Sequence, residues 1–67
     1  MGKQDENTEI VNTFREAARL TNPNSPSDRQ LRGWFTNAAE KREKGTPVDN
    51  EADLLKMAQA TIKVAEG

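Results

Sequence analysis

Three side chains near the middle of the chain have the chemistry that recognises nucleic-acid bases: Arg29, Gln30 and Arg32. Arginine pairs well with the edge of guanine, and glutamine with the edge of adenine. They follow a turn-forming stretch at 21–27, as in a helix-turn-helix protein whose second helix enters the major groove of DNA. One interpretation of the chain is therefore a DNA-binding protein in which these three residues contact the bases.

The distribution of charge makes DNA binding the alternative and not the first choice. Residues 25–45 carry a net charge of +2 and residues 46–67 a net charge of −2, and the whole chain carries −1. DNA-binding domains usually have a clear basic excess, because phosphate contacts supply much of their affinity. Asp28, Glu40 and Glu43 interrupt the basic stretch, which is typical of a solvated helix face.

The sequence contains few side chains that are suited to catalysis. The chain has no histidine, the commonest general acid or base at neutral pH, and no cysteine. Ser25 and Ser27 lie in a turn without a neighbouring base, where helix capping explains them. A carboxyl group needs burial to raise its pKa, and so short a chain has little interior. We expect no enzyme activity, no cofactor and no small-molecule substrate.

The stretch DNEAD at 49–53 resembles the start of a calcium loop, with Asp49, Glu51 and Asp53 at alternating positions. Leu54 stands where such a loop needs glycine, and Ala60 where it needs a bidentate glutamate. Acidic residues at the beginning of a helix are favoured by the helix dipole. We therefore expect no metal site.

The sequence shows neither a signal peptide nor a membrane-spanning segment. Its first nine residues are polar, unlike a signal peptide, and no apolar run approaches the roughly 18 residues of a membrane span. The sequence therefore predicts a cytoplasmic protein with no membrane partner.

Proline and glycine divide the chain into three segments with helical spacing of apolar residues. The first is residues 8–20, with Ile10, Phe14 and Ala17 on one face. The second is 26–44, with apolar residues at i, i+3, i+4, i+7 and i+8: Leu31, Trp34, Phe35, Ala38 and Ala39. The third is 47–65, in which Val48, Leu55 and Ile62 recur every seven residues. No stretch alternates like a strand.

Capping residues set the limits of these segments. Ser25 precedes Pro26, which suits the first position of a helix, although a capping box from Ser27 to Gln30 is an alternative. Gly45 ends the second helix. Thr46 and Pro47 repeat the Ser-Pro pattern and predict the beginning of the third helix at 47.

The prediction is one small all-α domain over residues 1–67, a three-helix bundle preceded by a frayed stretch at 1–7. Only eleven of the 67 residues are Leu, Ile, Val or Phe, so the stability is marginal. We expect Trp34 and Phe35 in the core. Gly33, inside a helix, marks either a close approach by another backbone or a neutral change on an exposed face.

An apolar strip along the third segment is left over after its core positions are assigned: Leu54, Met57, Thr61 and Val64. Methionine suits adaptable binding surfaces, and such strips are typical of contacts between helices of different chains. The first hypothesis is a non-enzymatic interaction or regulatory protein, of the size of bacterial or phage accessory proteins. It binds a protein partner, or itself as a homodimer, through this strip and the adjoining surface of the second helix.

Overall fold

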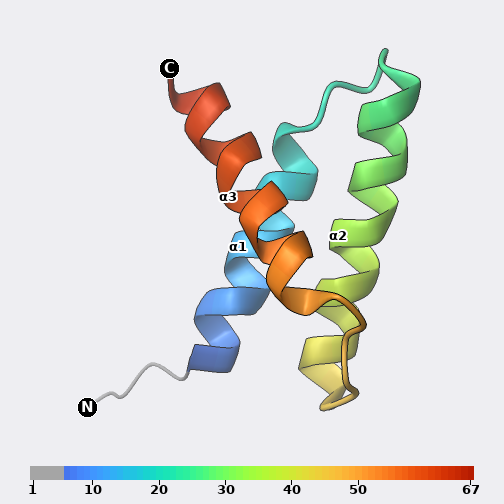
Figure 1. Cartoon of the computed structure of the whole chain (residues 1–67), viewed down its shortest axis with the longest axis vertical. Coiled ribbons are helices and arrows are strands. Elements are labelled where there is room, and N and C mark those ends of the chain that lie inside the picture. The colour runs from blue at the N-terminus through green and yellow to red at the C-terminus, as the bar shows by residue number, and fades with distance from the viewer. Residues whose placement is uncertain (1–5) are drawn as a thin grey trace.

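Three helices follow one another in the computed structural model, which describes residues 6–67. They are α1 (Glu6–Leu20), α2 (Pro26–Lys44) and α3 (Glu51–Glu66), and this part of the chain contains no strand. The predicted three-helix, all-α fold is confirmed (Figure 1). Of the stretch predicted to be frayed, residues 6 and 7 are instead the beginning of α1, and residues 1–5 lie outside the described residues.

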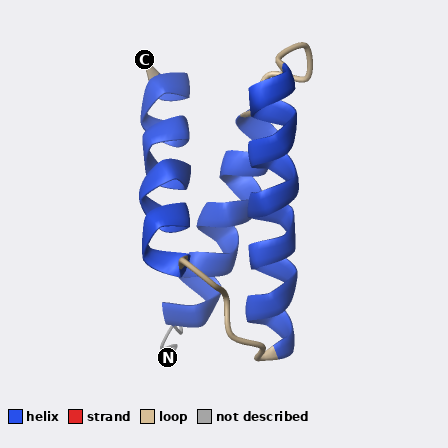
Figure 2. Ribbon diagram, turned by 45° about the vertical axis from the view of Figure 1, so that its right-hand side comes forward, coloured by secondary structure: helices blue, strands red, loops and turns tan. Residues whose placement is uncertain are grey.

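The central element is α1, which packs against both other helices, whereas α2 and α3 touch each other in few places. Its buried face consists of Val11, Phe14, Ala17 and Ala18, which recur at helical spacing. The Phe14 ring stacks on the Phe35 ring of α2, with 6.2 Å between ring centroids. Figure 2 shows α2 and α3 on either side of α1.

The ends of α2 are those that the sequence predicts. The Asp28 N–H donates a hydrogen bond of 3.4 Å to the Ser25 side chain, and Pro26 occupies the first turn. At the other end, Gly45 has φ +78°, a left-handed conformation that glycine adopts without strain. The Gly45 N–H donates to the Arg42 carbonyl, and the Thr46 N–H to the Lys41 carbonyl at 2.8 Å. This pair of bonds is a Schellman motif.

The predicted beginning of α3 at residue 47 is wrong, since the helix begins at Glu51. The Thr46 N–H is still bonded to the Lys41 carbonyl of α2, so the chain has to cross from α2 to α3 before the next helix can begin. Residues 45–50 connect the two helices, and Val48 packs against the core. Asn50, with φ 55°, precedes α3 without a side-chain cap bond.

The prediction that Trp34 belongs to the core is also wrong. Phe35 is fully buried, whereas 45% of Trp34 is exposed. Consecutive residues point about 100° apart around a helix. The side of α2 that faces α1 is centred on Phe35, Ala38 and Ala39, which leaves Trp34 on the flank that turns toward α3. Because α2 and α3 scarcely touch, that flank stays uncovered.

The core is thin. Its buried apolar residues are two phenylalanines, one valine and five alanines: Phe14, Phe35, Val11, Ala17, Ala18, Ala38, Ala39 and Ala58. The predicted core positions Val48, Leu55 and Ile62 are only partly buried and pack against this cluster. A chain that buries so little large apolar side chain gains little from the hydrophobic effect.

Polar contacts join the end of α2 to its neighbours. Arg42 Nε lies 2.7 Å from Glu51 Oε2 on α3, an ion pair without an aligned hydrogen bond. The Asn7 side-chain amide donates to the Arg42 carbonyl at 3.3 Å, and Arg15 of α1 pairs with Glu43 at 2.6 Å. These contacts link the end of α2 to α1 and to the beginning of α3, and they do not reach the far end of α3.

Candidate interaction groove

A groove of about 540 Å³ lies between α2 and α3, where the two helices diverge. We call it the α2–α3 groove. One wall comes from α2 and the other from α3 together with the connection that precedes it. Its lining residues are Trp34, Asn37, Ala38, Lys41, Val48, Asp49, Asn50, Asp53, Leu54 and Met57.

The α2 wall combines an aromatic ring, a small floor and a cation. Trp34, Asn37, Ala38 and Lys41 follow one another at i, i+3, i+4 and i+7, so helical geometry places them on one side of α2. Ala38 is buried and forms the floor, whereas Asn37 is exposed. Trp34 is the large apolar side chain that this wall offers to solvent.

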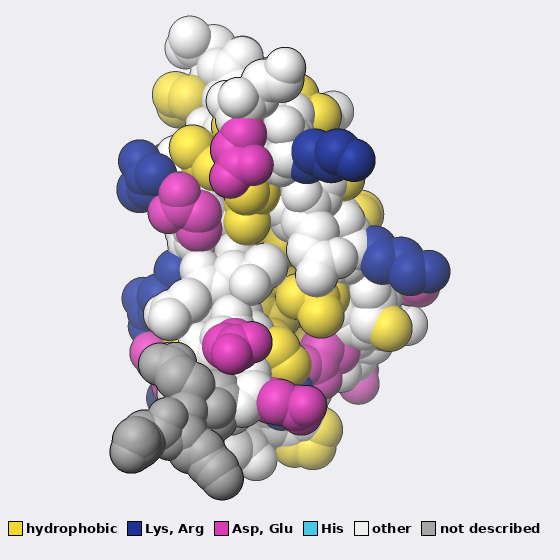
Figure 3. All heavy atoms as spheres, turned by 90° about the vertical axis from the view of Figure 1, so that its left-hand side faces the viewer, with side chains coloured by type: hydrophobic (Ala, Val, Ile, Leu, Met, Phe, Trp, Pro, Cys, Tyr) yellow, Lys and Arg dark blue, Asp and Glu magenta, His cyan; other side chains and the backbone are white. Residues whose placement is uncertain are grey.

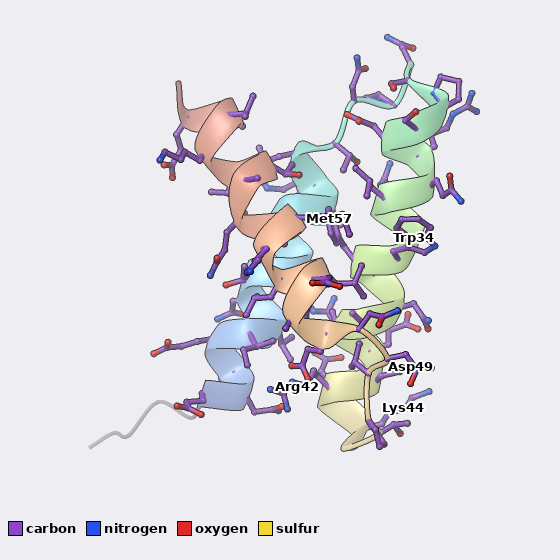
Figure 4. The ribbon with its side chains drawn as sticks, in the orientation of Figure 1. Trp34, Arg42, Lys44, Asp49 and Met57 are labelled. Carbon is purple, nitrogen blue, oxygen red and sulfur yellow. The ribbon has the colours of Figure 1, made fainter. Side chains whose placement is uncertain are left out.

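The α3 wall contains part of the apolar strip predicted from the sequence. Leu54 and Met57 line the groove and are half-buried, and Figure 4 shows Met57 at the same level as Trp34 on the opposite helix. Thr61 is half-buried, and its hydroxyl donates to the Met57 carbonyl at 2.9 Å. Val64 is 80% exposed. The strip therefore begins in the groove and continues past its end.

Opposite charges face the same groove. Lys41 belongs to the α2 wall, and Asp49 and Asp53 belong to the other wall. Among the described residues, none of these three side chains forms an ion pair. The groove thus presents apolar surface together with both an unpaired cation and unpaired carboxylates.

The sequence did not single out Lys41, Asn37 or the aspartates as contact residues, and it placed Trp34 in the core. The available signal was that Trp34 and Lys41 are seven residues apart at the edge of the apolar stripe of α2. What spacing does not provide is the separation between α2 and α3, which decides whether that edge is covered.

Arg29, Gln30 and Arg32 are all exposed near the beginning of α2. They do not continue into a basic face along the helix. Arg42 is half-buried and paired with Glu51, and Lys41 lines the groove. The predicted DNA-contacting residues are therefore accessible, but the basic residues nearer the end of α2 point to other sides.

A second, smaller hollow of about 330 Å³ lies between α1 and α3, on the side away from α2. Its lining residues are Glu6, Glu9, Ile10, Thr13, Leu55 and Gln59. Figure 3 shows the side of the molecule that α1 and α3 form, with hydrophobic side chains in a narrow seam and acidic ones beside it. This hollow has no exposed aromatic residue and no cation.

The described residues show one resolved pair of shifted pKa values, on the surface of α1. Glu16 accepts two hydrogen bonds from Arg19, and this pairing lowers the pKa of the Glu16 carboxyl and raises the pKa of the Arg19 guanidinium. Arg19 is exposed and Glu16 is partly exposed, and neither residue lines the α2–α3 groove. The pair belongs to the helix surface and not to a reactive site.

Within residues 6–67, no group of three or more histidine, cysteine, aspartate or glutamate side chains is placed to hold a metal ion. Of the acidic residues at 49–53, Glu51 pairs with Arg42, while Asp49 and Asp53 line the groove. In the same part of the chain, no helix combines the length and apolar character needed to cross a bilayer.

Comparison with protein-family models, curated proteins and solved structures found no match to this chain.

Proposed function

We propose that this protein is a non-enzymatic interaction module that binds a protein surface, from another protein or from a second copy of itself, through the α2–α3 groove. The observation that carries the proposal is the half-exposed Trp34 opposite Leu54 and Met57. Apolar side chains that lie together at the surface, as these three do on facing walls, are a feature of binding sites.

The chemistry of the two walls suits a helical ligand. Tryptophan is enriched among the residues that dominate binding energy at interfaces. Methionine adapts its shape to a partner side chain. An amphipathic helix laid between α2 and α3 would contact Trp34 on one side and Leu54 and Met57 on the other, which is the helix-in-groove mode of recognition.

DNA binding is the competing hypothesis, with Arg29, Gln30 and Arg32 as the contacts. These residues are accessible, but the groove accounts for the exposed aromatic residue and the basic residues of α2 point to several sides. The protein-binding proposal therefore has the better structural support.

The test compares immobilised wild-type protein with Met57→Glu and Ala60→Glu. Both variants place the same new charge on α3, but Ala60 is exposed and does not line the groove. Proteins from the native source that are retained by wild type and Ala60→Glu, and lost with Met57→Glu, would support the proposal. Circular dichroism shows whether each variant is folded.

A second arm tests DNA directly, with Trp34 anisotropy measured against mixed-sequence duplex at rising salt. Two results together would replace the proposal by the DNA-binding alternative. The anisotropy would rise with DNA in a salt-sensitive way that Arg29→Ala and Arg32→Ala abolish. The retention of proteins would be the same for Met57→Glu as for wild type.

A further inference from the structure

We infer that the occupant of the α2–α3 groove is a second copy of this chain, with the two α2 helices antiparallel about a two-fold axis near Asn37 and Ala38. This inference rests on the proposed function, since it names the occupant of the same groove.

The first reason is the thin core. Five of its eight buried apolar residues are alanine, and the four leucines and two isoleucines are at most partly buried. Domains of this size are only marginally stable by themselves, and oligomerisation is one stabilising device that requires no cysteine or metal. A second copy is present whenever the protein is, so its contact can stabilise the fold permanently.

The second reason is that the groove contains groups that can pair with one another when two copies of it meet. In a two-fold interface the same patch meets itself, so every group must find its complement within that patch. The α2–α3 groove has apolar surface to meet apolar surface, and the Lys41 ammonium to meet the face of the Trp34 ring. Lys41 has no ion-pair partner among residues 6–67 of a single copy, so its ammonium is available for a contact with the second copy.

The third reason is the spacing along α2. The midpoint between Trp34 and Lys41 falls between Asn37 and Ala38. An antiparallel pair of α2 helices centred there would place Lys41 of each copy opposite Trp34 of the other. A cation within about 6 Å of an indole ring is attracted to its face. Ala38 at the centre is small enough to let the two helix backbones come close.

The decisive experiment uses single cysteines, which the natural chain lacks entirely. Asn37→Cys lies beside the proposed axis, so two copies would bring their thiols within disulfide range. Glu40→Cys is also an exposed position of α2, but helical geometry turns it well away from the Trp34–Lys41 side. Mild oxidation should join Asn37→Cys into a covalent dimer much faster than Glu40→Cys. Equal rates for the two variants would overturn the proposed geometry.

Sedimentation equilibrium tests the same inference without oxidation. Wild type should be a dimer whose melting temperature rises with protein concentration. Lys41→Glu should raise the dissociation constant by about tenfold or more, the effect of losing an interaction of roughly 1.4 kcal/mol. Lys44→Glu makes the same charge change at an exposed residue outside the groove and should leave the constant unchanged (Figure 4).

The outcomes separate this inference from the proposed function. Wild type that stays monomeric at every concentration, with one melting temperature, overturns the second copy as occupant. If Met57→Glu then still abolishes retention of another protein, the groove binds a different chain and the proposed function stands. If neither dimerisation nor retention depends on Met57, both proposals fail.

Discussion

Two neighbouring aromatic residues, Trp34 and Phe35, have opposite surroundings in this fold. Phe35 is fully buried against Phe14, and Trp34 is half-exposed on the groove wall. The sequence alone places both in one apolar stripe. Their separation by about 100° around the helix decides which one packs against α1.

This difference predicts opposite costs of truncation. Phe35→Ala should reduce the free energy of unfolding by about 3–5 kcal/mol, since it empties the centre of the core. Trp34→Ala should cost less than about 1.5 kcal/mol in dilute protein, because much of the ring is already in water. Urea unfolding followed by circular dichroism measures both. Comparable losses for the two variants would mean that the indole is buried in solution.

A second residue-scale prediction concerns Glu16 and pH. Its pKa is lowered in the folded chain by the hydrogen bonds from Arg19, so the pair stabilises the fold above the unfolded pKa of the carboxyl. That contribution is lost as the pH falls through the folded pKa. We expect Glu16→Gln to melt slightly below wild type at neutral pH and level with it in acid. A difference that persists in acid would assign the effect to something other than this ion pair.

At the scale of the element, α2 is the helix whose limits the sequence predicted in full, from the Ser25 cap to Gly45. Local chemistry decides both of its ends, so no tertiary information is needed. The beginning of α3 was misplaced because Thr46-Pro47 also has the composition of a cap. In the structure the Thr46 N–H is still bonded to α2, and composition does not reveal how many residues the chain needs to cross to the next helix.

Gly33 is an unusual residue for the interior of α2. A Cβ built at this position meets no atom within 4 Å, so no other backbone approaches it closely inside the described chain. Gly33→Ala should therefore raise the free energy of unfolding by up to about 1 kcal/mol through better helix propensity. Thermal unfolding in dilute protein measures this gain. A loss of stability there would show that a neighbour does contact Gly33.

At the scale of the whole molecule, periodicity and punctuation were enough to predict three helices, whereas the groove was predictable only in part. Leu54 and Met57, which line the groove, were predicted as contact residues because they lie beside the core positions of α3. Lys41 and the aspartates were not, because whether two walls face each other depends on the distance between helices. Spacing within one helix carries no information about that distance.

The central position of α1 has a consequence for how the molecule moves. α1 and α2 share the stacked Phe14 and Phe35 rings, while Ala58 is the fully buried residue that α3 contributes. Segments with few buried contacts open at lower free energy than the rest of a protein. We therefore expect the α1–α2 hairpin to persist when α3 opens, with the 45–50 connection as the hinge. If α2 stays fixed on α1 while α3 moves, the distance between α2 and α3 can change. The width of the α2–α3 groove can then adjust to the ligand that binds there.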